Sequence, residues 1–234
     1  PGQSARGALL MAFLNALVSQ EFVPETLAAK VRAAVGKPLR RAAALTQLAL
    51  LGACACLSDE QRRQPTILLW QSTSGPRQET LNLLDEVCLG GAEPMPYDFL
   101  ATQPALAAAQ IQPFLPGLQL AMHLPQDSET SANWSTLLAL AGLWLEQGRC
   151  AQVLCAQLDH WAESATGQWL ALGAQPLENT LARLQIGGVA GIASQPDTPD
   201  LPARLNEWLS AGETSSFSLR SATNPRLAVE FARL

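Results

Sequence analysis

The sequence predicts an α/β fold in which helices cover a parallel or mixed sheet. Three short apolar runs, within residues 65–75, 117–124 and 151–158, are typical of central strands. Segments with helical periodicity alternate with these runs, a pattern that favours right-handed β-α-β connections. The chain has 234 residues, of which 48% are hydrophobic, so it can bury a large core. We therefore expect a single domain over residues 1–234.

The first 60 residues are predicted to be helical. Apolar residues recur there at helical spacing, at Leu10, Phe13, Leu14, Leu17 and Val18. A second helix is predicted over 24–35, because Pro24 suits a first turn and Gly36 suits a C-cap. A third helix, over 40–57, is apolar nearly all round, which indicates that it is buried.

The middle of the chain supplies the predicted sheet. The strand within 65–75 is followed by a helix over 78–91, a Pro-rich loop over 92–102 and an Ala-rich helix over 102–115. The next strand has one apolar face, made of Leu118, Leu120, Met122 and Leu124. A helix over 133–147 then connects this strand to the run at 151–158.

The last third of the sequence is less regular. It predicts a strand within 167–175, a helix over 203–212 and one more strand or helix at the end. The Gly-rich segment 187–191 lacks the glycine spacing of a phosphate-binding loop. A turn or close backbone packing therefore explains that segment better.

Composition argues against several functional classes. A net charge of −5 does not favour nucleic acid or an anionic membrane as a partner, and no apolar run reaches the ~18 residues of a transmembrane helix. The five cysteines have no C-x-x-C spacing and only two histidines are present, so we expect no metal site and no cofactor. Free thiols in apolar runs suggest buried cysteines and a cytoplasmic location.

Four segments, in order along the chain, resemble those of the β-ketoacyl synthases. KPLRRAAALTQLALLGACACL (37–57) resembles a helix with a basic start, and TILLWQSTSGPRQETLNLLDEV (66–87) resembles the strand, small-residue turn and helix that follow it. PMPYDFLATQPALAAAQI (94–111) resembles the P-x-x-F segment with its Ala-rich helix. Residues 117–159 resemble the nucleophile strand, the nucleophile-bearing helix and the next strand. The resemblance covers residues 37–160 and is strongest in the order of the segments.

This resemblance implies a thiolase-like α/β/α layered half-fold with a mixed, mostly parallel sheet. It is similar to short proteins that match only the N-terminal half of a synthase and accompany full synthases in aryl polyene and related pathways. The implied partners are a β-ketoacyl synthase or chain-length subunit, a second copy of the chain, and acyl carrier protein. Synthases dimerise by pairing the strand that corresponds to 117–124, and the basic segment 37–41 is a local candidate dock for acyl carrier protein.

The sequence departs from the synthase pattern at the residues that carry the chemistry. Counting back from Gly148, the nucleophilic cysteine position falls at or near Ser131, and none of the five cysteines is there. Synthases also use two histidines and a lysine from the second half of the fold, but no histidine follows His160 and no lysine follows Lys37. We therefore expect a non-catalytic partner or scaffold subunit.

An enzyme is the first alternative, namely an acyltransferase or hydrolase with Ser131 as nucleophile and His123 or His160 as base. Asp127 or Asp159 would be the acid of such a triad. A helix N-cap explains Ser131 better, however, because a serine there accepts a bond from a free N–H group. His123 within a strand suggests a satisfied core or surface residue.

A module that binds an acyl chain without turnover is the second alternative. It requires an apolar tunnel that reaches residues 125–135, and Trp134 at the helix start would fill such a tunnel. Trp70, Trp134 and Trp144 are otherwise expected to be core or interface residues. Four acidic residues are expected to be solvated: Asp85, Glu86, Asp197 and Asp200.

Overall fold

A computed structural model describes residues 10–90, 93–126, 132–187, 195–212 and 216–234. One mixed sheet of nine strands runs through the described chain, in the order β3-β2-β4-β5-β1-β6-β9-β8-β7. The strands are β1 (Leu10–Phe22), β2 (Thr66–Ser72), β3 (Leu118–Pro125), β4 (Gln152–His160), β5 (Ala165–Gly173), β6 (Ala182–Gly187), β7 (Gln195–Pro196), β8 (Phe217–Arg220) and β9 (Ala228–Ala232).

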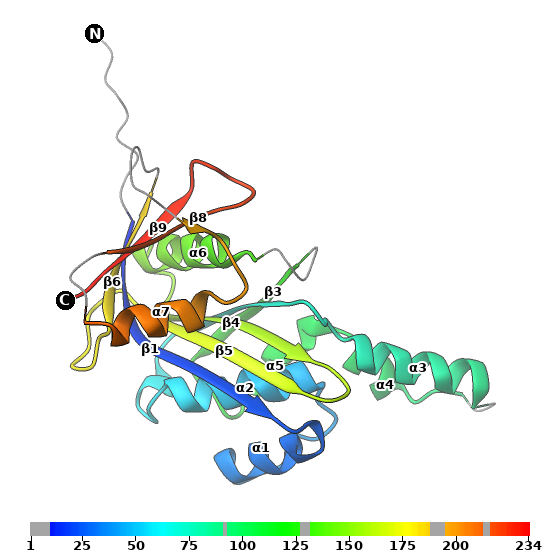
Figure 1. The fold of residues 1–234 in the computed structure, drawn as a ribbon. Coiled ribbons are helices and arrows are strands. Elements are labelled where there is room, and N and C mark those ends of the chain that lie inside the picture. Colours follow the sequence, from blue (N-terminus) through cyan, green and yellow to red (C-terminus); the bar gives the residue numbers. More distant parts are fainter. Residues whose placement is uncertain (1–9, 91–92, 127–131, 188–194, 213–215) are drawn as a thin grey trace.

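The helices lie on both sides of this sheet (Figure 1). The α-helices are α1 (Leu27–Val35), α2 (Ala44–Cys56), α3 (Arg77–Leu89), α4 (Pro96–Ala101), α5 (Ala107–Ile111), α6 (Trp134–Glu146) and α7 (Leu201–Ser210). Three single turns of 3₁₀ helix are η1 (Pro24–Thr26), η2 (Gln61–Arg63) and η3 (Pro104–Leu106). No helix within the described residues is long and apolar enough to cross a membrane.

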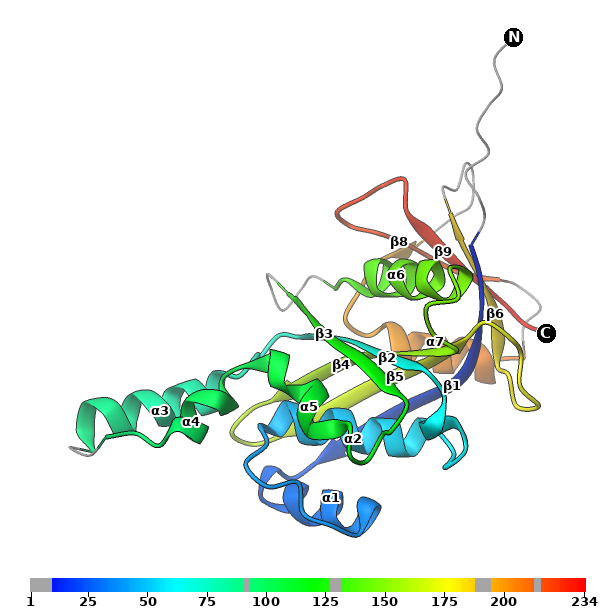
Figure 2. The ribbon, with the colours of Figure 1, turned by 180° about the vertical axis from the view of Figure 1, so that it is seen from behind.

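The first five strands form the α/β/α half-fold that the sequence predicts. Strands β1, β2, β3 and β4 run in one direction and β5 runs against them, in the order β3-β2-β4-β5-β1. One core cluster joins this sheet to α1, α2 and α5, and a second cluster joins its other face to α6 and α7. Figure 2 shows α2 and α5 on the side of the sheet away from α6.

The C-terminal strands repeat the pairing of the first half on a smaller scale. In the first half, β2 is parallel to β4, β4 is antiparallel to β5, and β5 is antiparallel to β1. In the second, β7 is parallel to β8, β8 is antiparallel to β9, and β9 is antiparallel to β6. Helix α7 precedes β8 as α6 precedes β4. The chain therefore contains one half-fold and a reduced second copy of it, which the sequence analysis did not identify.

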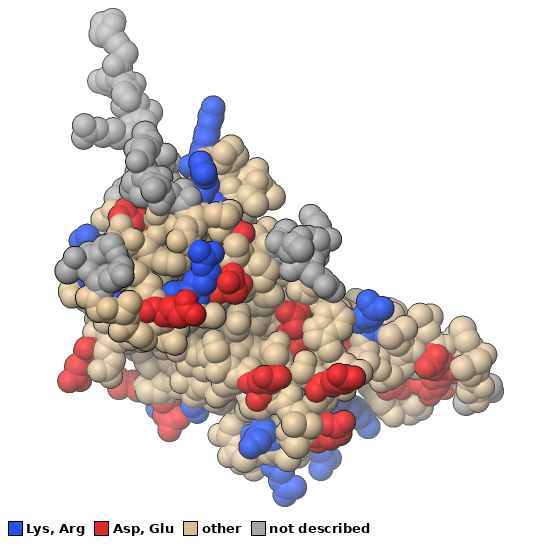
Figure 3. Space-filling view, in the orientation of Figure 1, with Lys and Arg blue, Asp and Glu red and all other residues tan. Residues whose placement is uncertain are grey.

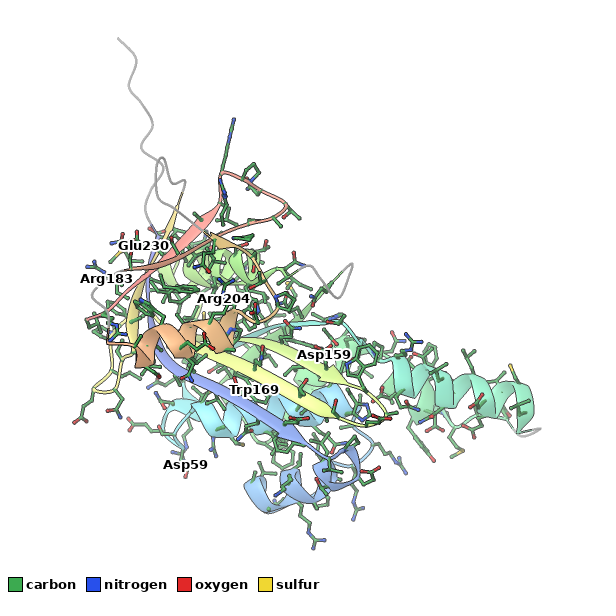
Figure 4. The ribbon with its side chains drawn as sticks, viewed as in Figure 1. Asp59, Asp159, Trp169, Arg183, Arg204 and Glu230 are labelled. Atoms are coloured by element: carbon green, nitrogen blue, oxygen red, sulfur yellow. The ribbon has the colours of Figure 1, made fainter. Side chains whose placement is uncertain are left out.

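The two copies meet at β1 and enclose α6 and α7. Strand β1 pairs with β6 over residues 10–14 and with β5 over residues 13–22. The inner faces of β6 and β9 are apolar, with Leu184 and Phe231 fully buried, whereas Arg183 and Glu230 lie on the outer face (Figure 4). Since that outer face is polar, strands β6 and β9 bury only the face that packs on the two helices.

Strand β1 corrects the helix that the sequence predicts near the start. Its residues have helical spacing, but Leu14 packs in the core with α6 while Ala16 packs on the side of α2. The register shifts between these two residues, and apolar side chains occupy both faces. A run with apolar residues on both faces fits the spacing of a helix and the spacing of a strand equally well. The segment forms a strand because it pairs with β5 and β6.

Other predicted elements agree with the structure except in detail. Helix α1 ends at Gly36, whose φ of 73° is the left-handed C-cap, and α2 is buried over most of its length. The predicted loop 92–102 contains the short helix α4. In β3 the register shifts after Leu118, so this residue packs with α2 and α5, on the opposite face from Leu124. Cys88 is exposed, contrary to expectation, while Cys150 and Cys155 are buried.

Candidate functional site

Polar side chains connect the start of α6 to the carboxyl ends of β2 and β4. The N–H of Asn133, the residue before α6, donates to Oε1 of Gln71 at 2.9 Å. Nε2 of Gln71 donates to Oε1 of Gln157 at 3.3 Å, and Nε2 of Gln157 donates to Oδ2 of Asp159 at 3.2 Å. This row of side chains fixes the first turn of α6 over the sheet. Gln71 and Gln157 were not among the site residues predicted from the sequence.

Asp159, at the end of β4 (Figure 4), holds the turn after β2. Its Oδ1 accepts the N–H groups of Thr73 and Ser74, at 2.6 and 2.8 Å, and the hydroxyl of Ser72 at 3.1 Å. Only 7% of Asp159 is exposed. Every donor recorded for this carboxylate in the described residues is a backbone N–H, a hydroxyl or an amide. Asp159 therefore orients the turn, and its geometry is not that of the acid in a catalytic triad.

Asp197, from the reduced second copy, caps α6. Its Oδ2 accepts the N–H of Ser135 at 2.8 Å and the Ser135 hydroxyl at 2.7 Å, and the N–H of Trp134 also donates to this carboxylate. Asp197 is only 5% exposed, which corrects the solvated position expected from the sequence. Burial raises the pKa of Asp197, although the hydrogen bonds from Ser135 oppose that rise.

Together these contacts occupy the N–H groups at the start of α6. The free N–H groups of a first helical turn are what binds an anion, or stabilises an oxyanion, at such a position. Here Gln71 takes the N–H of Asn133, and Asp197 takes those of Trp134 and Ser135. The chain itself thus supplies the acceptors for these N–H groups.

Both candidate histidines lie on the face of the sheet opposite α6. The ring of His123 stacks on Trp70, with centroids 4.5 Å apart, and Trp70 belongs to the cluster that α2 and α5 cover. His160 pairs directly with Ala165, which is in the same cluster, and residues directly opposite in a ladder share a face. Nε2 of His123 is buried without a hydrogen-bond partner, and burial lowers the pKa of this histidine.

The structure brings together no catalytic group from the remaining candidates that it describes. Ser131 and Asp127 lie outside the described residues, and α6 starts at Trp134 with Asn133 at the N-cap position. Trp134 is fully buried in the core, as the sequence analysis expected. Two large cavities, of about 440 and 490 Å³, lie elsewhere, beside Asn15 and beside Phe22. Within the described ranges, no group of three or more His, Cys, Asp or Glu residues is placed to hold a metal ion.

Solved structures similar to this chain are ketosynthases and their complexes. A ketosynthase (ApeO) in complex with its chain length factor (ApeC), from Xenorhabdus doucetiae, is 14% identical, with 97% of this chain and 98% of that chain covered and a TM-score of 0.55. The ishigamide ketosynthase/chain length factor is 12% identical, with 96% and 99% covered and a TM-score of 0.63.

A third solved structure is a type II polyketide synthase acyl-carrier protein in complex with its ketosynthase bound to the hexaketide (AntDE:AntF). It is 10% identical, with 96% of this chain and 99% of that chain covered and a TM-score of 0.58. No protein-family model matches the chain, and no curated protein matches it in sequence. The structural likeness shows that the chain has the thiolase-like fold of the ketosynthases.

Proposed function

We propose that this chain is a non-catalytic, ketosynthase-like subunit that pairs with a β-ketoacyl synthase and sets or supports the geometry of its product chain. The observation that carries the proposal is the start of α6, where Gln71 accepts the N–H of Asn133 and Asp197 accepts the N–H of Ser135. The two histidines on the opposite face of the sheet support it as well.

The partner would bind along β3. This strand is at one end of the sheet, and among the described strands it pairs with β2 alone. Its outward residues include Leu120 and Met122, both exposed. A free strand edge with apolar side chains is a surface that pairs readily with another strand. The similar solved structures include complexes of a ketosynthase with a chain length factor and with an acyl-carrier protein, which supports partners of these two kinds.

The finer assignment is to fatty-acid or polyketide biosynthesis of the aryl polyene type, in the cytoplasm. The chain would work as a homodimer or a heterodimer, with a ketosynthase as the preferred partner. The acyltransferase or hydrolase using Ser131 stays an alternative because Ser131 is outside the described residues. The acyl-chain module is less well supported, since Trp134 fills the core at the start of α6.

A reconstitution experiment tests this proposal. The chain and the purified β-ketoacyl synthase from the same host would be mixed, and the complex weighed by native mass spectrometry. Condensation activity on acyl carrier protein substrates would be measured with the wild-type chain and with Ser131→Ala. We expect a complex whose activity depends on the chain and is unchanged by Ser131→Ala. Loss of activity in that variant would favour the enzyme alternative, and absence of any complex would refute the proposal.

A further inference from the structure

Helices α3 and α4 form a strongly solvent-exposed part of the molecule. We call the described residues from 77 to 101 the α3–α4 arm. Neither helix contains a buried residue, and the two views show them packed on each other and projecting from the body beyond the end of β2 (Figures 1 and 2). The base of the arm is fixed, because Oε1 of Glu79 accepts the N–H of Ala44 at 2.9 Å. The arm therefore projects from the body while a hydrogen bond fixes its base.

The arm exposes many large apolar side chains. They are Leu81, Leu84, Val87, Leu89, Met95, Phe99 and Leu100, each between 45% and 81% exposed. Leu81, Leu84 and the exposed Cys88 are spaced by three and four residues, so they form one stripe along α3. Single exposed apolar residues are ordinary on a monomer, but a concentration of this kind marks an interaction surface.

The arm is acidic: residues 77–101 hold five acidic residues, Glu79, Asp85, Glu86, Glu93 and Asp98, and one basic residue, Arg77, at its start. The Arg41 guanidinium also lies 4.7 Å from the centre of the Tyr97 ring of α4. No Lys or Arg occurs from residue 78 to residue 148, whereas 8 of the 20 acidic residues do. The rest of the chain holds all 15 basic residues. Glu86 and Asp98 line a cavity of about 120 Å³ between α3 and α4. Figure 3 shows carboxylate groups along this projecting part and basic side chains at its base.

We infer that the α3–α4 arm is a docking element for a different polypeptide, one that presents an apolar surface bordered by Lys and Arg. The inference rests on the proposed function, and it identifies the occupant as the synthase subunit. The apolar stripe would be buried against that partner, and its cations would meet Asp85, Glu86 and Asp98. Such charge pairing selects a partner and speeds association.

A second copy of this chain fits the arm poorly. Two-fold pairing through the β3 edge and the arm would bring together two acidic surfaces, because the arm has five acidic residues and one basic residue. Like charges brought together at an interface disfavour the wrong pairing. The arm would therefore select a heterodimer over a homodimer, which are the two states the proposed function leaves open.

Binding to the purified synthase tests the role of the exposed apolar residues of the arm. The triple variant Leu84→Asn, Val87→Asn, Phe99→Asn is expected to raise the Kd for the synthase by tenfold or more. A matched control, Val23→Asn with Leu177→Asn, changes exposed apolar residues away from the arm and is expected to stay within twofold. These residues are exposed, so both variants should fold, which circular dichroism would verify.

Two further measurements leave the apolar side chains of the arm unsubstituted. Alkylation of Cys88 by a maleimide, followed on its own peptide by mass spectrometry, should slow at least tenfold in the complex. Asp85→Lys with Glu86→Lys should raise the Kd at low salt and weaken its salt dependence, whereas Glu163→Lys should not.

The outcomes separate the inference from the proposed function. If the synthase binds the arm variants and the control equally well, and Cys88 reacts at its free rate in the complex, the inference is wrong and the proposed function stands. If the wild-type chain does not bind the synthase, both are wrong. The inference also requires the chain alone to sediment as a monomer in 50 mM salt; a dimer that the triple variant dissociates would make a second copy the occupant.

Discussion

Asp197 places a carboxylate at the first turn of α6, 62 residues away along the chain from its partner Ser135. The segment around it is rich in Pro, Asp and Ser and has the composition of a solvated loop. Nothing local distinguishes an aspartate in such a loop from one that caps a distant helix. The start of α6 itself gave no better signal, because Asn133 makes no side-chain cap bond there.

The protonation of Asp197 should be visible in the stability of the protein. Burial raises the pKa of this carboxyl above its ordinary value, so the folded state favours the neutral form. The stability that this group contributes is fully present below the ordinary pKa and is lost as pH rises through the folded pKa. We therefore expect the free energy of unfolding of the wild type, relative to Asp197→Asn, to fall as pH rises from the ordinary aspartate pKa through the raised pKa, measured by urea titrations at a series of pH values.

Truncation at the same position separates charge from capping. Asp197→Ala leaves the N–H groups of Trp134 and Ser135 without their acceptor and should cost about 1–2 kcal/mol at low pH, with a smaller cost as pH rises through the raised pKa. A relative stability that instead rises with pH would contradict the raised pKa.

Helix α2 comes close to β5 because of a glycine in its interior. A Cβ atom at Gly52 would lie 1.9 Å from the ring of Trp169, and one at Gly167 would lie 2.0 Å from the same ring. The indole of this fully buried tryptophan (Figure 4) thus lies against two residues that lack a side chain. Glycine weakens a helix interior in general, so close packing is the reason for this one.

Gly52→Ala should therefore destabilise the protein even though alanine favours helix. The overpacking should lower the free energy of unfolding by about 1–3 kcal/mol or more, measured by urea denaturation. In the background of Trp169→Leu, where the ring is absent, the same substitution should cost much less. Equal costs in both backgrounds would show that the tryptophan is not the obstacle.

Most elements could be predicted from sequence because their signals are local. The Pro24 and Gly36 positions delimit the segment that forms η1 and α1, and the apolar run of β2 stands between polar turns. Strand β1 could not be predicted, since its identity depends on β5 and β6, more than 140 residues away. The order of segments predicted the thiolase-like fold, whereas the contacts of Gln71, Gln157 and Asp197 at the start of α6 arise only from tertiary packing.

The whole molecule depends on a core that both copies of the half-fold share. Phe231 of β9 and Leu184 of β6 are in one cluster with Trp134 of α6 and Leu69 of β2. Helix α6 contacts strands of both copies, β2 and β4 of the first and β6 and β9 of the second. Neither copy therefore buries its inner face without the other. We expect residues 10–232 to unfold as one cooperative unit.

Phe231→Ala is a direct probe of that cooperativity. Removal of a fully buried phenylalanine should cost about 3–5 kcal/mol. Calorimetry should still give a single transition, with equal calorimetric and van't Hoff enthalpies. Hydrogen exchange should accelerate in β2 and α6 as well as in β9. Two transitions, with only the lower one shifted by the variant, would mean that the second copy folds on its own.

The position of β1 also bears on the order of events during synthesis. Of the described strands, β1 is synthesised first. Its two neighbours in the sheet, β5 and β6, are synthesised much later, before β7, β8 and β9. Until residue 173 has emerged, the apolar run from Leu10 to Val18 has no ladder to join. Closing so long a loop slows folding and leaves aggregation-prone surface open in the meantime. The growing chain therefore keeps this apolar segment without its strand partners for most of its synthesis.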